Sequence, residues 1–105
     1  MVHSKLVRDK ILQIILAQKK QPIYHGATEK EYGEYLMKKL QEEVNEFFEA
    51  ENKEELADVM EVIYAICQHK QFDLSDIEKV RMKKKEERGA FNDRLILDQI
   101  IEVNP

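Results

Sequence analysis

The sequence predicts an all-α fold, and three observations lead to that prediction. Only three glycines and two prolines occur in 105 residues, which disfavours a turn-rich sheet. Hydrophobic residues make up 43% of the chain and charged residues 36%, a mixture typical of amphipathic helices. From Tyr32 to Phe47, apolar residues recur at spacings of four, four, four and three, which places them on one helix face. We therefore expect four to five helices in a single domain, residues 1–105.

Two helices are expected in the first half of the chain. Apolar residues between Leu6 and about Lys19 have broadly helical spacing, and the polar run QKKQP then ends the segment. After a loop, Thr28 and Glu31 form a T-x-x-E capping box. The second helix is therefore expected to run from Thr28 to about Ala50.

The second half of the chain predicts two further helices. The third is expected from Glu54 to about Lys70, and the short polar link ENK before it implies an antiparallel hairpin with the second. Asp73 or Ser75 can cap a fourth helix, which should end near Arg88 because Gly89 is a typical stop signal. The tail FNDRLILDQIIEV is ambiguous between a short helix and an extended segment.

Charge is distributed unevenly along the chain. Between Glu42 and Glu61, nine acids accompany one base, so this stretch carries about −8 and the remainder about +4. Concentrated carboxylates flanked by basic segments suit a metal ion with a phosphate ligand, whereas a nucleic-acid-binding module would not place its acids in this way.

The sequence also bears on the cellular location. No apolar stretch approaches the ~20 residues that a membrane-spanning helix needs, so no membrane partner is expected. The N-terminus MVHSKLVRDK lacks the apolar core of a signal peptide, and Cys67 has no second cysteine with which to pair. A cytoplasmic protein with Cys67 in its core is the expectation.

Several acids of the second expected helix lie where apolar side chains would be usual. A projection at 100° per residue places Glu43 inside the apolar stripe and Glu46 at its edge. Glu42 and Glu49 project towards the polar side. Glu43 and Glu46 therefore form one pair, three residues apart and aimed towards the core.

The third expected helix carries a matching pair. Glu55 and Asp58 project among apolar neighbours, and an antiparallel hairpin would bring them to face the first pair. Like charges in one small space must be protonated, paired with bases or bound to cations. Ligands that are all oxygen favour a hard ion, Mg²⁺ or Mn²⁺.

Two other interpretations of the acids compete with a metal site. The acids can form a solvated helix face with Lys39, Lys53 or Lys70 as salt-bridge partners, and the pattern alone does not decide between this and a metal site. A di-iron carboxylate bundle would need Glu-x-x-His motifs, and no histidine follows an acid at that offset.

Four strings resemble a known family. QEEVNE (41–46) and EELAD (54–58) resemble the E-E-x-x-E and E-x-x-D elements of the MazG-like superfamily of all-α nucleotide pyrophosphohydrolases. KLVRDKI (5–11) and RGAF (88–91) are similar to strings of a compact branch described as house-cleaning phosphatases. Together the matches reach from near one end of the chain to near the other.

The resemblance implies roles for particular residues. The implied metal ligands are Glu43, Glu46, Glu55 and Asp58. Lys39 matches a lysine that approaches the substrate phosphates in relatives, and Glu42 is a candidate water-orienting base. The substrate-binding candidates are Arg8, Lys10 and Arg88, with Lys84 the weakest of the basic candidates. Eight residues separate Glu46 from Glu55, fewer than in many MazG-like proteins, which leaves the depth of the pocket open.

The resemblance also implies an activity and an assembly. The activity is Mg²⁺-dependent cleavage of a non-standard nucleoside triphosphate to the monophosphate and pyrophosphate, by attack of a metal-activated water on the α-phosphorus. The bundle is expected to be completed by oligomerisation, in a homodimer or a dimer of dimers. The alternative is a non-catalytic helical module of the same fold that binds a nucleotide or another protein.

Overall fold

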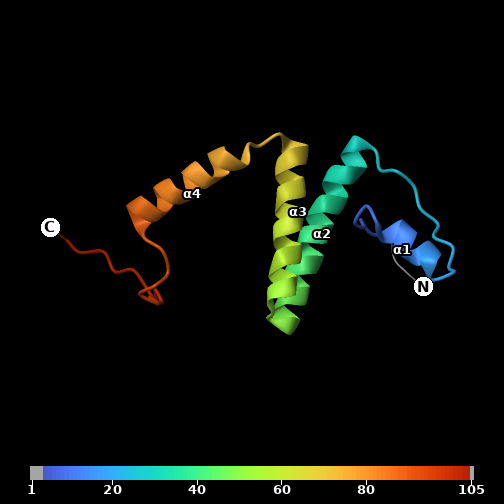
Figure 1. The fold of residues 1–105 in the computed structure, drawn as a ribbon. Coiled ribbons are helices and arrows are strands. Elements are labelled where there is room, and N and C mark those ends of the chain that lie inside the picture. The colour runs from blue at the N-terminus through green and yellow to red at the C-terminus, as the bar shows by residue number, and fades with distance from the viewer. Residues whose placement is uncertain (1–3, 105) are drawn as a thin grey trace. The chain divides into compact units, whose positions relative to one another are not determined.

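The computed structural model describes residues 4–104, and the helices within that range match the predicted all-α class (Figure 1). No strand occurs in this part of the chain. Contacts divide the chain into two compact units, of which the first ends at Phe72 and the second begins at Asp73. The helices are α1 (Ile11–Ala17), α2 (Glu29–Ala50), α3 (Lys53–Lys70) and α4 (Leu74–Arg88).

Helix α2 begins and ends where the sequence predicts. The backbone N–H of Glu31 donates to Thr28 Oγ1 at 3.1 Å, so Thr28 is the N-cap. The helix ends at Ala50 because Glu51 adopts a left-handed conformation, with φ of 50°, and donates its N–H to the carbonyl oxygen of Phe47 at 2.8 Å.

A two-residue turn joins α2 to α3. After Glu51, the side chain of Asn52 accepts a hydrogen bond from the N–H of Glu55 at 3.0 Å, so α3 begins at Lys53, one residue before the predicted start. The two helices lie side by side and antiparallel, as predicted (Figure 1). The Asn52 cap places Glu55 in the first turn of α3, and Asp58 follows one turn later on the same side of the helix.

The core of the first unit lies between α2 and α3. Leu36, Val62 and Cys67 are its buried hydrophobic residues, and Leu36 is only 1% exposed. The buried position of Cys67 confirms the prediction made for it. Near the start of α2, the ring of His69 lies over Gly33, where an added Cβ would meet His69 Nε2 at 3.0 Å. Glycine at position 33 therefore permits this close approach.

Helix α1 is shorter than the predicted segment from Leu6 to Lys19. It spans Ile11–Ala17, its N-cap Lys10 makes no side-chain capping bond, and Lys19 has a φ of 61°, which ends helical geometry. The apolar residues before Ile11 therefore lie outside the helix, because no cap stabilises an earlier start.

The second unit contains α4 and the C-terminal tail. Asp73, one of the two predicted caps, accepts bonds from the N–H and the hydroxyl of Ser75, each at 2.8 Å. The helix ends at Arg88, and Gly89 follows with a φ of 84°, as the stop signal predicts. Residues 95–104 form neither helix nor strand. Of the two alternatives that the sequence left open, the short helix does not form in residues 95–104.

We expect Asp73→Ala to destabilise α4. The two bonds from Ser75 hold the pKa of Asp73 below its ordinary value of 3.8, so the carboxylate's contribution to stability is present above that pH. It is lost as the pH falls through the lowered pKa. Amide hydrogen exchange at neutral pH should show faster exchange in the first turn of α4 in the variant. Glu86→Ala removes the same charge far from the cap and should leave this turn unchanged; equal protection in Asp73→Ala and wild type would contradict the capping role.

Candidate metal site

Glu43 is a buried acid on the face of α2 that packs against α3. Glu43 is only 7% exposed, as expected from its position in the apolar stripe. One carboxylate oxygen, Oε1, lies 3.3 Å from Lys39 Nζ. The other, Oε2, is buried without a hydrogen-bond partner among the described residues. A buried oxygen of this kind carries a desolvation cost that a bound cation can offset.

The surroundings of Glu43 favour its protonated form. Burial raises the pKa of the carboxyl above its ordinary value of 4.5, and the nearby carboxyl of Glu46 raises it further. The Lys39 ammonium acts in the opposite direction but does not reverse the shift. Glu43 in its ionised form is therefore under-neutralised by the protein's own groups.

Carboxylates of α2 and α3 meet across the hairpin. One oxygen each from Glu43, Glu55 and Asp58 lie within 4.8 Å of one another. Glu55 Oε2 is the second buried oxygen that has no partner in the described part of the chain. Two oxygens bound at about 2.1 Å to one Mg²⁺-sized ion are at most ~4.2 Å apart. Small side-chain rotations would therefore bring these three carboxylates to a common ion.

Glu46 joins this arrangement through a second group on α2. Oxygens of Glu42, Glu43 and Glu46 also lie within 4.8 Å of one another, so Glu43 belongs to both groups. Glu42 projects towards the polar side of α2, but its side chain is only 33% exposed and its carboxylate lies near those of Glu43 and Glu46. A glutamate side chain is long enough to bend back over the neighbouring turn. We refer to Glu42, Glu43, Glu46, Glu55 and Asp58 as the carboxylate cluster.

Two bases contact the carboxylate cluster. Arg8 donates to Asp58 Oδ1 at 2.7 Å, and Lys39 Nζ lies 3.3 Å from Glu43 and 3.5 Å from Glu42. Of the salt-bridge partners weighed from the sequence, Lys39 has this role, whereas Lys53 and Lys70 form no ion pair within residues 4–104. Five acids against two bases leave an excess of three negative charges when all are ionised. The cluster can therefore accept a divalent cation.

The donor set fits a hard divalent ion. Every donor of the cluster is a carboxylate oxygen, and two of these oxygens are buried with no partner among residues 4–104. The ligands come from two helices that one tight turn joins. Ligands of this kind suit Mg²⁺ or Mn²⁺ and do not suit soft metals, which prefer thiolate or imidazole.

The other basic residues that the sequence singled out are placed differently. Lys10 is exposed at the N-cap of α1. Arg88 is the last residue of α4 and Lys84 lies one turn before it, so both belong to the second unit. Of the predicted basic residues in the first unit, Arg8 and Lys39 contact the carboxylate cluster.

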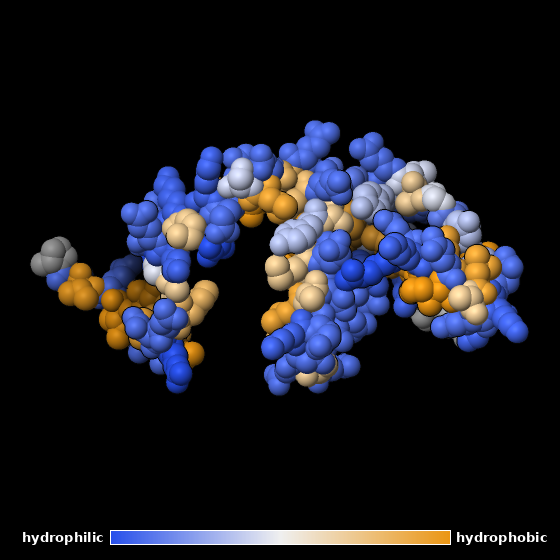
Figure 2. Space-filling model, in the orientation of Figure 1, coloured by the Kyte–Doolittle hydropathy of each residue, from blue (hydrophilic) through white to orange (hydrophobic). Residues whose placement is uncertain are grey.

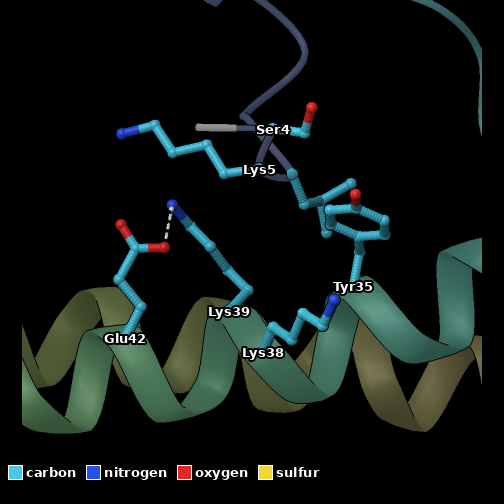
Figure 3. Close-up of a pocket in the computed structure, with 7 residues that line it drawn as sticks. Ser4, Lys5, Tyr35, Lys38, Lys39 and Glu42 are labelled. Atoms are coloured by element: carbon cyan, nitrogen blue, oxygen red, sulfur yellow. Dashed lines mark hydrogen bonds and ion pairs between the residues drawn. The ribbon is translucent and has the colours of Figure 1, made fainter. Parts of the chain in front are cut away.

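Sequence reasoning missed a group of residues beside the cluster. Ser4, Lys5, Tyr35 and Lys38 line a pocket that Lys39 and Glu42 also line (Figure 3). The signal available in the sequence was the lysine pair at positions 38 and 39, one turn before the acid motif. The approach of residues 4–6 to α2 is a tertiary contact that helix periodicity does not encode.

The fold and the site define an all-helical chain whose central hairpin carries a carboxylate cluster suited to a hard divalent cation. No protein-family model, curated protein or solved structure matches the chain. Within the described residues, none of the helices is both long enough and apolar enough to cross a membrane.

Proposed function

We propose that the chain is a Mg²⁺-dependent nucleoside triphosphate pyrophosphohydrolase, as its resemblance to the MazG-like superfamily implies. The observation that carries the proposal is the meeting of Glu43, Glu55 and Asp58 from two helices, with two buried carboxylate oxygens that lack a partner in the described part of the chain. A structural ion-pair network would be expected to satisfy such oxygens, whereas a metal site leaves them for the ion.

The proposed reaction adds water across the bond between the α- and β-phosphates of the substrate. The oxygen of water bonds to the α-phosphorus, pyrophosphate leaves with the bridging oxygen, and the proton of the water goes to a base and then to solvent. Bound Mg²⁺ would supply an activated water and offset phosphate charge. Glu43, Glu46, Glu55 and Asp58 would hold the ion.

The remaining groups of the site would position the reactants. Glu42 lies beside Glu43 and Glu46 with its side chain 33% exposed, so it can accept a proton from the attacking water and pass it to solvent. The Lys39 ammonium contacts Glu42 and Glu43 and has a third N–H to donate to a phosphate oxygen. Arg8, which is 60% exposed, can exchange Asp58 for a phosphate with little structural cost.

A direct assay tests this function. The full chain is mixed with Mg²⁺ and a panel of nucleoside triphosphates, both standard and chemically damaged, and pyrophosphate is measured. We expect release of pyrophosphate and nucleoside monophosphate that stops when EDTA is added. Release of inorganic phosphate with a diphosphate product would assign a different reaction, and nucleotide binding without turnover would support the non-catalytic module instead.

We further propose that a second copy of the chain completes the bundle. On α3, Leu56, Met60 and Ile63 share one face at spacings of four and three, and are 47%, 51% and 40% exposed. Figure 2 shows apolar surface on the hairpin of the first unit. Only three hydrophobic residues are buried within the described chain, a small core for its size. Association through this stripe would enlarge the core.

A dimer would make the thermal stability of the protein depend on its concentration. Because association stabilises the folded chain, the melting temperature should rise with protein concentration, and sedimentation should give twice the mass of one chain. Met60→Glu places a charge in the stripe and should shift the protein towards monomer. Gln68→Glu adds the same charge on another face of α3 and should not. A monomeric wild-type protein with a concentration-independent melting temperature would contradict the proposal.

A further inference from the structure

A basic pocket lies directly beside the carboxylate cluster in the first unit. Its volume is about 330 Å³, the lower end of the range for small-molecule sites. It is lined by Ser4, Lys5, Tyr35, Lys38, Lys39 and Glu42, together with one apolar side chain (Figure 3). Three ammonium groups against one carboxylate give the pocket an excess of positive charge, the opposite of the neighbouring cluster.

Lys39 and Glu42 connect the pocket to the cluster. Both residues line the pocket, and Lys39 Nζ also contacts Glu43 at 3.3 Å. The Lys39 side chain is only 16% exposed, so its charge is less screened than that of a surface lysine. In Figure 3 the amino groups of Lys5 and Lys39 and the carboxylate of Glu42 lie on the same side of the pocket. A ligand bound at Lys39 would therefore lie between the ammonium groups of the pocket and the carboxylate cluster that Lys39 also contacts.

The remaining wall suits an anion better than a nucleobase. Tyr35 is the aromatic residue of the pocket, and the ammonium of Lys38 sits 4.8 Å from the centre of its ring. This cation–π contact occupies one face of the ring, which reduces its use as a stacking platform. The hydroxyls of Ser4 and Tyr35 can donate hydrogen bonds to oxygen acceptors. The lining thus combines hydroxyl donors with flexible cations, a combination that fits phosphate oxygens.

We infer that this pocket binds the terminal two phosphates of the substrate, the group that leaves as pyrophosphate. The inference rests on the proposed function, in which the α-phosphate lies at the carboxylate cluster. Lys39 then stands at the junction, and the β- and γ-phosphates lie in the pocket between the amino groups of Lys5 and Lys38, which Figure 3 shows on opposite sides. A nucleoside in the same place would leave the ammonium groups of Lys5 and Lys38 without an ionic partner among the described residues. Lys5, Lys38 and Ser4 thereby become binding residues for the leaving group.

Binding of inorganic pyrophosphate tests the inference without turnover. The full chain in EDTA is titrated with pyrophosphate and, separately, with inorganic phosphate, by calorimetry or by NMR of the labelled backbone. We expect pyrophosphate to bind more tightly than phosphate. Lys5→Ala and Lys38→Ala should each weaken pyrophosphate binding by about tenfold, since each removes one charge-assisted contact. Both side chains are exposed, so the fold should be retained.

Lys30→Ala is the matched control. Lys30 is an exposed lysine of α2, as Lys38 is, but it does not line the pocket. An equal loss of affinity in Lys30→Ala and Lys38→Ala would reduce the effect to net charge and overturn the inference. The absence of pyrophosphate binding to the wild type at millimolar concentration would also overturn the inference.

Failure of the proposed function can be distinguished from failure of the pocket assignment. If no triphosphate is cleaved, the proposed function fails while the titration still reports on the pocket. If pyrophosphate is released but its product inhibition is unchanged in Lys5→Ala and Lys38→Ala, the pocket assignment alone fails.

Discussion

Replacement of Glu43 by glutamine should abolish pyrophosphate release and leave the metal-free protein as stable as the wild type, or more stable. The amide keeps nearly the same shape but removes one charged ligand from the cluster. We expect the rate to fall at least ~10²-fold, the size typical of removing one charge-stabilising group from an active site. Asp58→Asn should have the same effect on activity.

The expected gain in stability follows from the raised pKa of Glu43. Burial, the neighbouring Glu46 carboxyl and the partial compensation by Lys39 leave the pKa above 4.5, so the folded chain binds this proton more tightly than the unfolded chain. The resulting stability is fully present below pH 4.5 and is lost as the pH rises through the raised pKa. Glutamine cannot ionise, so the variant does not lose this stability. In EDTA, the free energy of unfolding of Glu43→Gln should exceed that of the wild type most at neutral pH, and the difference should disappear towards pH 4.5.

Glu49→Gln is the control for both effects. Glu49 lies on α2, is exposed and belongs to neither group of close carboxylates. Its replacement should change neither activity nor the rise in melting temperature that Mg²⁺ produces. If Glu43→Gln instead lowered the stability of the metal-free protein and kept the magnesium-dependent rise, Glu43 would be a salt-bridged structural residue.

Leu36→Ala should cause the largest loss of stability of any single replacement considered for this chain. Leu36 is 1% exposed and is the largest fully buried side chain in the described residues. Truncation of a buried leucine to alanine costs about 2–5 kcal/mol, from lost transfer free energy and the cavity that remains. In a chain of this size, such a loss lowers the melting temperature by roughly 10–30 °C. Thermal unfolding followed by circular dichroism measures the shift.

Met37→Ala provides the comparison for Leu36→Ala. Met37 is the next residue of α2 and is 45% exposed, so its truncation removes a side chain of similar size from a site that water already reaches. Its effect should be within about 1 kcal/mol. Equal melting temperatures for the two variants would mean that α2 does not pack on α3 through Leu36.

The helices could be predicted because their signals are local. Thr28 and Glu31 mark the start of α2, Asp73 caps α4, and Gly89 follows its last residue, and each signal acts within one helical turn. The start of α1 was predicted too early because apolar spacing alone does not fix a boundary without a cap. The tail was ambiguous because its apolar spacing does not distinguish a short helix from an extended segment.

The candidate site could be predicted in part. Helical projection identified Glu43, Glu55 and Asp58, because their direction follows from position on two adjoining helices. The projection placed Glu42 towards the polar side and did not indicate that its carboxylate lies close to those of Glu43 and Glu46. It also gave no information on the Arg8–Asp58 ion pair or on the approach of Lys5 to α2, since both depend on how the segment before α1 folds back onto the hairpin.

Binding of Mn²⁺ measured by electron paramagnetic resonance tests the central claim most directly, because it needs neither a substrate nor turnover. We expect the wild-type chain to bind Mn²⁺ and Mg²⁺ to compete for the same site. Glu43→Gln and Asp58→Asn should each weaken Mn²⁺ binding by at least ~10-fold, and Glu49→Gln should not change it. Equal Mn²⁺ affinities in the wild type and Glu43→Gln, or no Mn²⁺ binding by the wild type at millimolar concentration, would contradict a metal site at this hairpin.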